Sequence, residues 1–109
     1  MAAKFETFEG KDGKHYFNLK AGNGQVVLAS QGYKSTDGCA NGIESVKENG
    51  DLEENFDSKE SANGKFFFNL KAKNSQVIGK SEMYESASGR DKGIQAVIRA
   101  VGSVIEAGG

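Results

Sequence analysis

The chain is one structural unit written twice. Residues 4–50 align with residues 55–101 at a constant offset of 51 positions and without a gap. The segment KHYFNLKAGNGQVV corresponds to KFFFNLKAKNSQVI, and YKSTDGCANGIESV corresponds to YESASGRDKGIQAV. About 50 residues alone form at most a marginal domain, so two copies are expected to share one core. The sequence therefore predicts a single domain over 1–109, divided into repeat one at 4–50, an acidic connector at 51–54, repeat two at 55–102, and a helix end and tail at 103–109.

Three strands are expected in each copy. The first lie at 4–8 and 55–59, the second at 14–21 and 65–72, and the third at 25–30 and 76–81. Asp12-Gly13 and Asn63-Gly64 separate the first two strands, as expected for hairpin turns. The second strand alternates with period two, which predicts one buried and one open side. The side chains expected to point inward are those of His15, Phe17, Leu19, Phe66, Phe68 and Leu70.

A helix is expected after the third strand. Ser35 and Ser86 suit helix N-caps because a serine oxygen accepts an amide hydrogen of the first turn. Apolar residues then recur at spacings of three and four, which is typical of a helix face. That stripe consists of Ile43 and Val46 in repeat one, and of Ile94, Val97, Ile98, Val101, Val104 and Ile105 in repeat two. The second helix is expected to be the longer one and to extend to Ala107.

Two β-β-β-α repeats predict an α+β fold with pseudo-two-fold symmetry, in which one antiparallel six-stranded sheet carries both helices on one face. Gly38 and Gly42 recur as Gly89 and Gly93, although a glycine inside a helix costs about 1 kcal/mol relative to alanine. Close packing of the helix on the sheet is the favoured explanation. A helix–helix crossing through the G-x-x-x-G spacing is the alternative.

Composition limits the function classes. A formal net charge of −1 gives no strong field for nucleic acid or an anionic membrane. A single cysteine excludes an intramolecular disulfide framework. Neither a membrane-length apolar run nor the apolar stretch of a secretory signal is present. We therefore expect a soluble, cytoplasmic protein that does not associate with membranes.

The strand, turn and helix pattern together resembles a known family. DGKHYFNLKAGNGQVV, NGKFFFNLKAKNSQVI and the motif Y-x-S-x6-GI-x-x-V in both copies are similar to the YegP-like family of small bacterial proteins classed as a domain of unknown function. The similarity covers residues 4–101. The similarity implies the tandem β3α repeat and a single sheet with two helices. The family also includes single-repeat members that would pair as dimers. It brings no activity, cofactor or catalytic residue.

Few residues suggest chemistry. His15 is the only histidine, and no cysteine or carboxylate lies at metal-ligand spacing from it. Cys39 corresponds to Arg90 in the second copy, so we expect Cys39 to be exposed and incidental. Glu9 and Glu60 recur beside symmetry-related turns and are expected to lie far apart. We therefore predict no catalytic residue, no metal ligand and no cofactor.

The outward side of the second strands is the candidate contact surface. It combines an aromatic residue, an asparagine and a lysine in each copy: Tyr16, Asn18, Lys20, Phe67, Asn69 and Lys71. Such side chains can pack a protein partner or stack a base. An ordinary solvated face, with aromatics present for strand propensity, is the alternative interpretation.

The sequence thus favours a non-enzymatic binding or interaction module that is monomeric, with an internal pseudo-dimer. A protein or peptide partner is favoured over nucleic acid. A small-molecule enzyme with its site between the repeats, or a weak single-stranded nucleic-acid binder, is the alternative.

Overall fold

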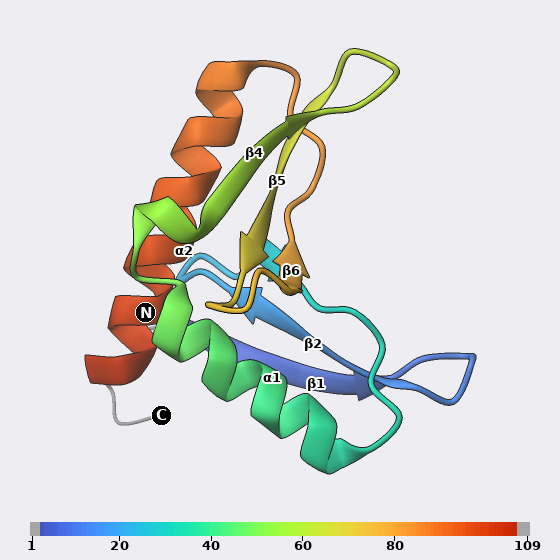
Figure 1. Cartoon of the computed structure of the whole chain (residues 1–109). Helices are drawn as coiled ribbons and strands as arrows, with labels where there is room; N and C mark the ends of the chain where they lie inside the picture. Colours follow the sequence, from blue (N-terminus) through green and yellow to red (C-terminus); the bar gives the residue numbers. More distant parts are fainter. Residues whose placement is uncertain (1–2, 107–109) are drawn as a thin grey trace.

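The computed structural model describes residues 3–106, with side chains described up to residue 104. Each repeat folds as three strands followed by a helix (Figure 1). The elements of repeat one are β1 (Lys4–Glu9), β2 (His15–Lys20), β3 (Val26–Ala29) and α1 (Thr36–Asn49). Those of repeat two are β4 (Phe56–Glu60), β5 (Phe66–Lys71), β6 (Val77–Lys80) and α2 (Ala87–Glu106).

The six strands form one antiparallel sheet in the order β1-β2-β3-β6-β5-β4. The repeats meet at the centre, where Ala29 of β3 pairs with Lys80 of β6. These two residues are 51 positions apart and therefore equivalent in the repeat, so the pseudo-two-fold axis passes through this pair. The predicted α+β fold with one six-stranded sheet and two helices is confirmed.

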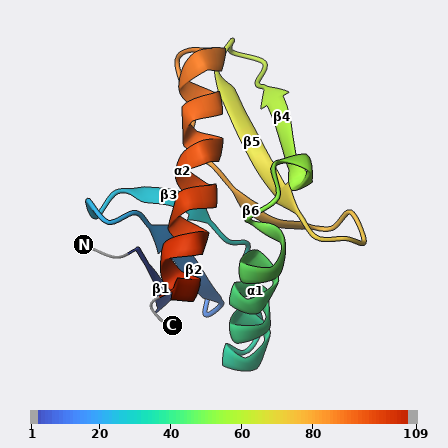
Figure 2. The ribbon, with the colours of Figure 1, turned by 90° about the vertical axis from the view of Figure 1, so that its left-hand side faces the viewer.

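Both helices cover the same side of the sheet. In Figure 2, α2 lies in front of β3, and α1 lies to the right of its lower half. Both helices contact β2 and β5. Beneath them, Phe17, Leu19, Phe68 and Leu70 are fully buried. They contact the helix side chains that the apolar stripe predicted, with Val46, Val97 and Val101 also fully buried. The predicted inward phase of the second strands is therefore correct.

A β-bulge explains the unclear phase of the third strand. Leu19 pairs with Leu28, whereas the next residue, Lys20, pairs with Val26. The extra residue, Val27, therefore lies opposite no single partner, and both Val27 and Leu28 are buried. The same register shift occurs between Leu70 and Lys71 in repeat two. Two successive apolar residues can thus both face the core.

The recurring serines and glycines have structural roles. Ser35 and Ser86 cap their helices, each accepting a hydrogen bond of 3.0 Å from the backbone amide three residues later. A Cβ atom at Gly42 would lie 2.7 Å from Cζ of Tyr33 and 3.0 Å from Cε2 of Phe17. Gly93 makes the equivalent approach to Tyr84. The glycines admit a tyrosine ring between helix and sheet, which agrees with the favoured explanation of helix-on-sheet packing.

Large and small residues alternate across the pseudo-axis. Leu28 and Gly79 are equivalent positions in the repeat, and a Cβ at Gly79 would lie 2.7 Å from Cγ of Leu28. Likewise, a Cβ at Gly50 would lie 2.9 Å from Cγ2 of Val101, its own equivalent. One copy thus supplies the side chain and the other supplies the space. The two repeats are therefore complementary rather than interchangeable.

The predicted start of the first strand of repeat two differs from the structure. Asn55 was expected to open a strand, but it ends a short 3₁₀ helix, η1 (Glu53–Asn55), in the connector. Its side chain donates a hydrogen bond of 3.0 Å to the carbonyl of Asn49, which ties the connector to the end of α1. The helix α2 is described to Glu106, so Ala107 and the side chain of Ile105 lie outside the described residues.

Candidate functional site

The face of the sheet opposite the helices carries a row of residues that crosses every strand. The register joins Glu6 to Asn18, Asn18 to Ala29, Ala29 to Lys80, Lys80 to Asn69, and Asn69 to Asp57. Cross-strand partners point to the same side of a sheet. We call these six residues the transverse row: Glu6, Asn18, Ala29, Lys80, Asn69 and Asp57. Because the row passes through the Ala29–Lys80 pair, its two halves are related by the pseudo-two-fold axis.

The recurring lysines of this face are held by edge-strand carboxylates. Nζ of Lys20 lies 2.7 Å from Glu6, and Nζ of Lys4 lies 3.1 Å from the same carboxylate. In repeat two, Lys71 and Lys59 lie 3.0 and 3.2 Å from Asp57.

Hydrogen bonds from Lys20 and then Lys4 lower the pKa of Glu6 below its ordinary value. Those from Lys71 and Lys59 lower the pKa of Asp57. Cross-strand ion pairing therefore accounts for the recurrence of Lys20 and Lys71 without a ligand.

The aromatic residues of this face have different neighbours in the two repeats. Tyr16 stacks on Phe8 with ring centroids 5.5 Å apart, and Phe8 is 47% exposed. The hydroxyl of Tyr16 donates a hydrogen bond of 2.6 Å to Asp12 and thereby lowers the pKa of that carboxyl. Phe67 instead lies under Nζ of Lys80, which is 4.8 Å from its ring centroid. Repeat one thus presents an exposed Phe8 stacked on a half-buried Tyr16, and repeat two presents a ring covered by a cation.

Asn18 and Asn69 are the recurring residues of this face that local contacts leave unexplained. Both are half-buried members of the transverse row. No hydrogen bond joins either side-chain amide to another residue within 3–106. By contrast, the recurring Asn23 and Asn74 accept hydrogen bonds from the backbone amides of Gln25 and Gln76 in their turns. Asn18 and Asn69 therefore keep free donors and acceptors at symmetry-related positions.

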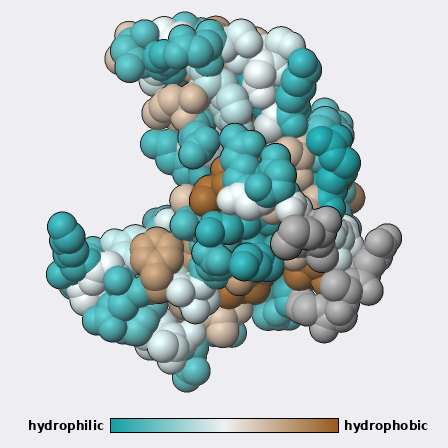
Figure 3. Space-filling view, turned by 180° about the vertical axis from the view of Figure 1, so that it is seen from behind, coloured by the Kyte–Doolittle hydropathy of each residue, from teal (hydrophilic) through white to brown (hydrophobic). Residues whose placement is uncertain are grey.

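The two halves of the sheet diverge around this face. The β1–β2 and β4–β5 hairpins extend towards the same side of the molecule with β6 between them (Figure 1). Seen from behind, the surface is hollowed between two lobes whose atoms are mostly hydrophilic (Figure 3). An extended ligand that lay across the transverse row would meet equivalent side chains on both sides of the axis.

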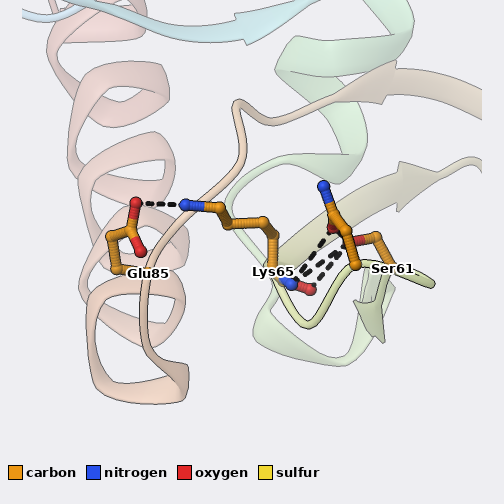
Figure 4. Close-up of polar contacts among 4 residues, drawn as sticks. Ser61, Lys65 and Glu85 are labelled. Carbon is orange, nitrogen blue, oxygen red and sulfur yellow. Dashed lines mark hydrogen bonds and ion pairs between the residues drawn. The ribbon is translucent and has the colours of Figure 1, made fainter.

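The ends of the two hairpins are stabilised by different side-chain contacts. In repeat two, Lys65 forms an ion pair with Glu85 of the loop before α2, and its backbone amide lies 3.2 Å from the Ser61 hydroxyl (Figure 4). The positions equivalent to Lys65 and Glu85 are Lys14 and Lys34, which are both basic. The first hairpin is stabilised instead by the hydrogen bond from the Tyr16 hydroxyl to Asp12.

The expected exposure of Cys39 is wrong. Cys39 is 3% exposed, and burial raises the pKa of its thiol. The comparison with Arg90 failed because an arginine can bury its stem and place its guanidinium over an aromatic ring, as Arg90 does over Phe66. Cys39 instead lines a cavity of about 350 Å³ together with His15 and Glu9. Sequence spacing did not show that these three residues meet.

The remaining predicted positions follow the topology. Glu9 and Glu60 end β1 and β4, which are opposite edges of the sheet, as expected from their place beside symmetry-related turns. Within residues 3–106, no three side chains of the His, Cys, Asp and Glu types are grouped so that they could hold a metal ion. No described helix combines the length and apolarity needed to cross a bilayer.

Comparison with known proteins identifies the family. The model of a domain of unknown function, DUF1508, matches twice, at residues 11–57 and 61–103. The chain belongs to the DUF1508 family. Among its relatives, it is 50% identical over 97 residues to the UPF0339 protein in the ptx operon 5′ region of Stutzerimonas stutzeri, covering 89% of this chain and 87% of that protein. It is 46% identical over 97 residues to the UPF0339 protein YegP of Escherichia coli strain K12, covering 89% and 88%.

Solved structures of DUF1508 relatives share the fold. The solution NMR structure of the protein of unknown function yegP from Escherichia coli superposes with a TM-score of 0.87 at 44% identity, covering 93% of this chain and 87% of that one. The UPF0339 protein of Shewanella oneidensis gives a TM-score of 0.85 at 42% identity, covering 93% and 86%. The family assignment thus agrees with the resemblance seen in the sequence, and it brings no activity or ligand.

Proposed function

We propose that the protein is a non-enzymatic binding module that holds an extended peptide, or an extended segment of a protein, across the transverse row. The observation that carries the proposal is the pair Asn18 and Asn69. Their amides recur in both repeats, lie on the side of the sheet without helices, and make no hydrogen bond with the described residues. An asparagine amide offers both donors and an acceptor, which suits the alternating groups of a peptide backbone.

The geometry favours a ligand of some length. Asn18 and Asn69 are separated by the two central strands, so three strand spacings, or about 14 Å, lie between them. That distance is the reach of about four extended residues. The exposed Phe8, stacked on Tyr16, adds apolar contact area on one side of the axis. A compact small molecule would reach only one of the two asparagines.

The cavities between the repeats support the non-enzymatic reading. One of about 290 Å³ lies between the β2–β3 turn and α2, and one of about 320 Å³ lies between α1 and β6. Their linings include Arg99, Ser103, Tyr33 and Ser45, but among described residues they contain no histidine, cysteine or carboxylate. A hydroxyl without a neighbouring base is a weak nucleophile.

A photo-crosslinking experiment tests the proposal. A photoreactive phenylalanine analogue is placed at Ala29, in the centre of the row, and in a matched control at Gln95 on the outer face of α2. Peptide segments captured from a native lysate at Ala29 and absent at Gln95 are then synthesised and titrated. We expect Asn18→Ala and Asn69→Ala each to weaken binding about fivefold, since each removes about 1 kcal/mol of hydrogen bonding. Glu48→Ala and Gln95→Ala on the helices should have no effect.

Titrations of the same variants distinguish a peptide partner from a single-stranded nucleic acid. A peptide partner should bind with a shallow dependence on salt, and Tyr16→Ala should weaken it. A single-stranded nucleic acid should lose affinity steeply as salt rises, and nuclease treatment should remove the crosslink. Equal capture at Ala29 and Gln95, or unchanged affinity in the Asn18→Ala/Asn69→Ala double variant, would overturn the proposal.

A further inference from the structure

A cavity in repeat one corresponds to a place that an arginine fills in repeat two. The cavity, of about 350 Å³, lies where the ends of β1 and β2 meet the start of α1. Its lining includes Thr7, Glu9, His15, Thr36, Cys39 and Ile43. Thr7 and Glu9 pair with Phe17 and His15, so these strand residues belong to the face that the helices cover. None of the six residues of the transverse row lines the cavity, although Phe8, which stacks on Tyr16, lies at its rim.

The backbone around this place is the same in both repeats. His15 donates a backbone hydrogen bond of 2.8 Å to Tyr33, and Phe66 donates one of 2.9 Å to Tyr84. At the start of the helices, the amides of Cys39 and Arg90 each lie 3.1 Å from the carbonyl of the capping serine. The difference between the repeats therefore lies in the side chains.

The side chain of Arg90 shows which chemical group occupies the equivalent place in repeat two. Its Cζ atom lies 5.5 Å from the centroid of the Phe66 ring, and its side chain is only 17% exposed. Two guanidinium nitrogens, Nε and Nη2, each lie 3.3 Å from Oδ1 of Asp91. A planar guanidinium stacks on a ring more readily than an ammonium does. Repeat two thus contains a guanidinium site that its own chain occupies.

We propose that the cavity of repeat one binds the guanidinium group of an arginine side chain supplied by another molecule. Cys39 stands where Arg90 stands in repeat two, and its short side chain leaves the space open. The His15 imidazole takes the place of the Phe66 ring as the stacking surface. Among the described residues, Glu9 is the one carboxylate of the lining, and it takes the role of counter-charge that Asp91 has for Arg90. These groups suit a planar cation and disfavour an anion.

The probe is N-acetyl-L-arginine amide, which carries the side chain without a second charge. Binding to the full-length protein is followed by NMR at the backbone amides of His15, Thr36 and Cys39. We expect saturable shifts at these three residues. The citrulline analogue, which has the same shape without the charge, should bind about tenfold more weakly. The lysine analogue should also bind more weakly, because an ammonium does not stack flat.

Variants that exchange the repeats provide the controls. Cys39→Arg supplies the occupant from within the chain and should abolish binding of the probe. His15→Phe restores the ring of repeat two and should keep binding, whereas His15→Ala should lose it. Arg90→Ala should open a second site over Phe66, so that the protein binds a second equivalent.

Equal affinity for the arginine and citrulline analogues would overturn the proposal, as would undiminished binding by Cys39→Arg. If Cys39→Arg does not fold, the His15→Phe and His15→Ala pair decides, since equal binding by both would show that no stacking on this ring occurs.

Discussion

Tyr33 and Tyr84 each pack against a glycine nine positions later in the chain, so the size of one residue limits that of another. Each tyrosine also stacks on a fully buried phenylalanine, with ring centroids 6.2 Å apart for Phe17–Tyr33 and 6.4 Å apart for Phe68–Tyr84. Burial raises the pKa of both tyrosine hydroxyls. The motif Y-x-S-x6-G thus encodes three linked features, namely a ring under the helix, the helix cap and the space for that ring.

Alanine at Gly42 should therefore destabilise the fold. Its Cβ would meet both the Tyr33 ring and Phe17, and a fully buried ring has little room to move. We expect a loss of about 1–3 kcal/mol in the free energy of unfolding. Gly102→Ala is the matched control, since a Cβ there meets nothing within 4 Å inside α2. That change should stabilise the protein by up to about 1 kcal/mol. Urea denaturation measures both, and stabilisation by Gly42→Ala would contradict the packing argument.

Individual residues also show which features could be predicted from the sequence and which could not. The inward places of Phe17 and Leu19 followed from alternation alone, because period two is a local property of a strand. The burial of Cys39 did not follow, because its expected exposure assumed that Arg90, at the equivalent position, points into solvent. The meeting of His15, Glu9 and Cys39 joins two strands and a helix and leaves no pattern in the sequence. Whether Asn18 and Asn69 bind a ligand stays a prediction.

At the scale of elements, the edge strands β1 and β4 are tied to the sheet by side-chain charge as well as by backbone pairing. Glu6 and Asp57 are equivalent in the repeat, and each accepts two lysines across the open face. Charged residues on edge strands also discourage pairing with another chain. The sequence predicted the strands within one or two residues. It did not predict the bulges, because Val26 and Val27 are both apolar and the alternation therefore does not show which of them faces the core.

The edge carboxylates should make stability depend on pH. The folded-state pKa of Glu6 is lowered from 4.5 and that of Asp57 from 3.8, through hydrogen bonds from lysines. Their contribution is therefore present above these ordinary values and is lost as the pH falls through the lower folded pKa values. The variant Glu6→Gln/Asp57→Asn should have a lower melting temperature than the parent at pH 7. The difference should shrink in strong acid and in about 1 M salt.

Differential scanning calorimetry at pH 7 and pH 2.5 measures this change. Gln95→Ala, on the outer face of α2, is the control; because neither side chain titrates, its difference from the parent should not depend on pH. A gap between variant and parent that stays constant from pH 7 to pH 2.5 would contradict the assignment.

At the scale of the whole molecule, the two repeats form one core by being unequal at the axis. Leu28 fills the space above Gly79, and Val101 fills the space beside Gly50. The helix α2 continues beyond Ala100, the position equivalent to the last residue of α1, whereas the chain after α1 forms η1, and Asn55 of η1 donates a hydrogen bond to the carbonyl of Asn49. The duplication predicted the symmetry of the fold. The departures from symmetry arise from contacts between positions 51 residues apart, which no local pattern contains.

This inequality predicts how the separated repeats behave. A fragment of residues 1–53 leaves β3 as an unpaired edge and half of its core exposed, so it should not fold as a monomer. In a symmetric dimer of that fragment, two Leu28 side chains would meet at the axis. In a symmetric dimer of residues 54–109, two Gly79 residues would face each other and leave the space unfilled. Only a dimer of the two different fragments places one leucine against one glycine at the axis.

We therefore expect the two fragments, when mixed, to form a heterodimer at least about tenfold tighter than either homodimer, since filling a leucine-sized space contributes about 2–5 kcal/mol. Sedimentation velocity of each fragment and of the equimolar mixture measures the association. Circular dichroism should show a cooperative thermal transition that depends on concentration in the mixture. Leu28→Gly in the first fragment should weaken the preference, because only the Val101–Gly50 contact then still favours the mixture. A sharp, concentration-independent transition for monomeric 1–53 would show that one repeat builds its own core, contrary to the shared core argued from the Leu28–Gly79 and Val101–Gly50 contacts.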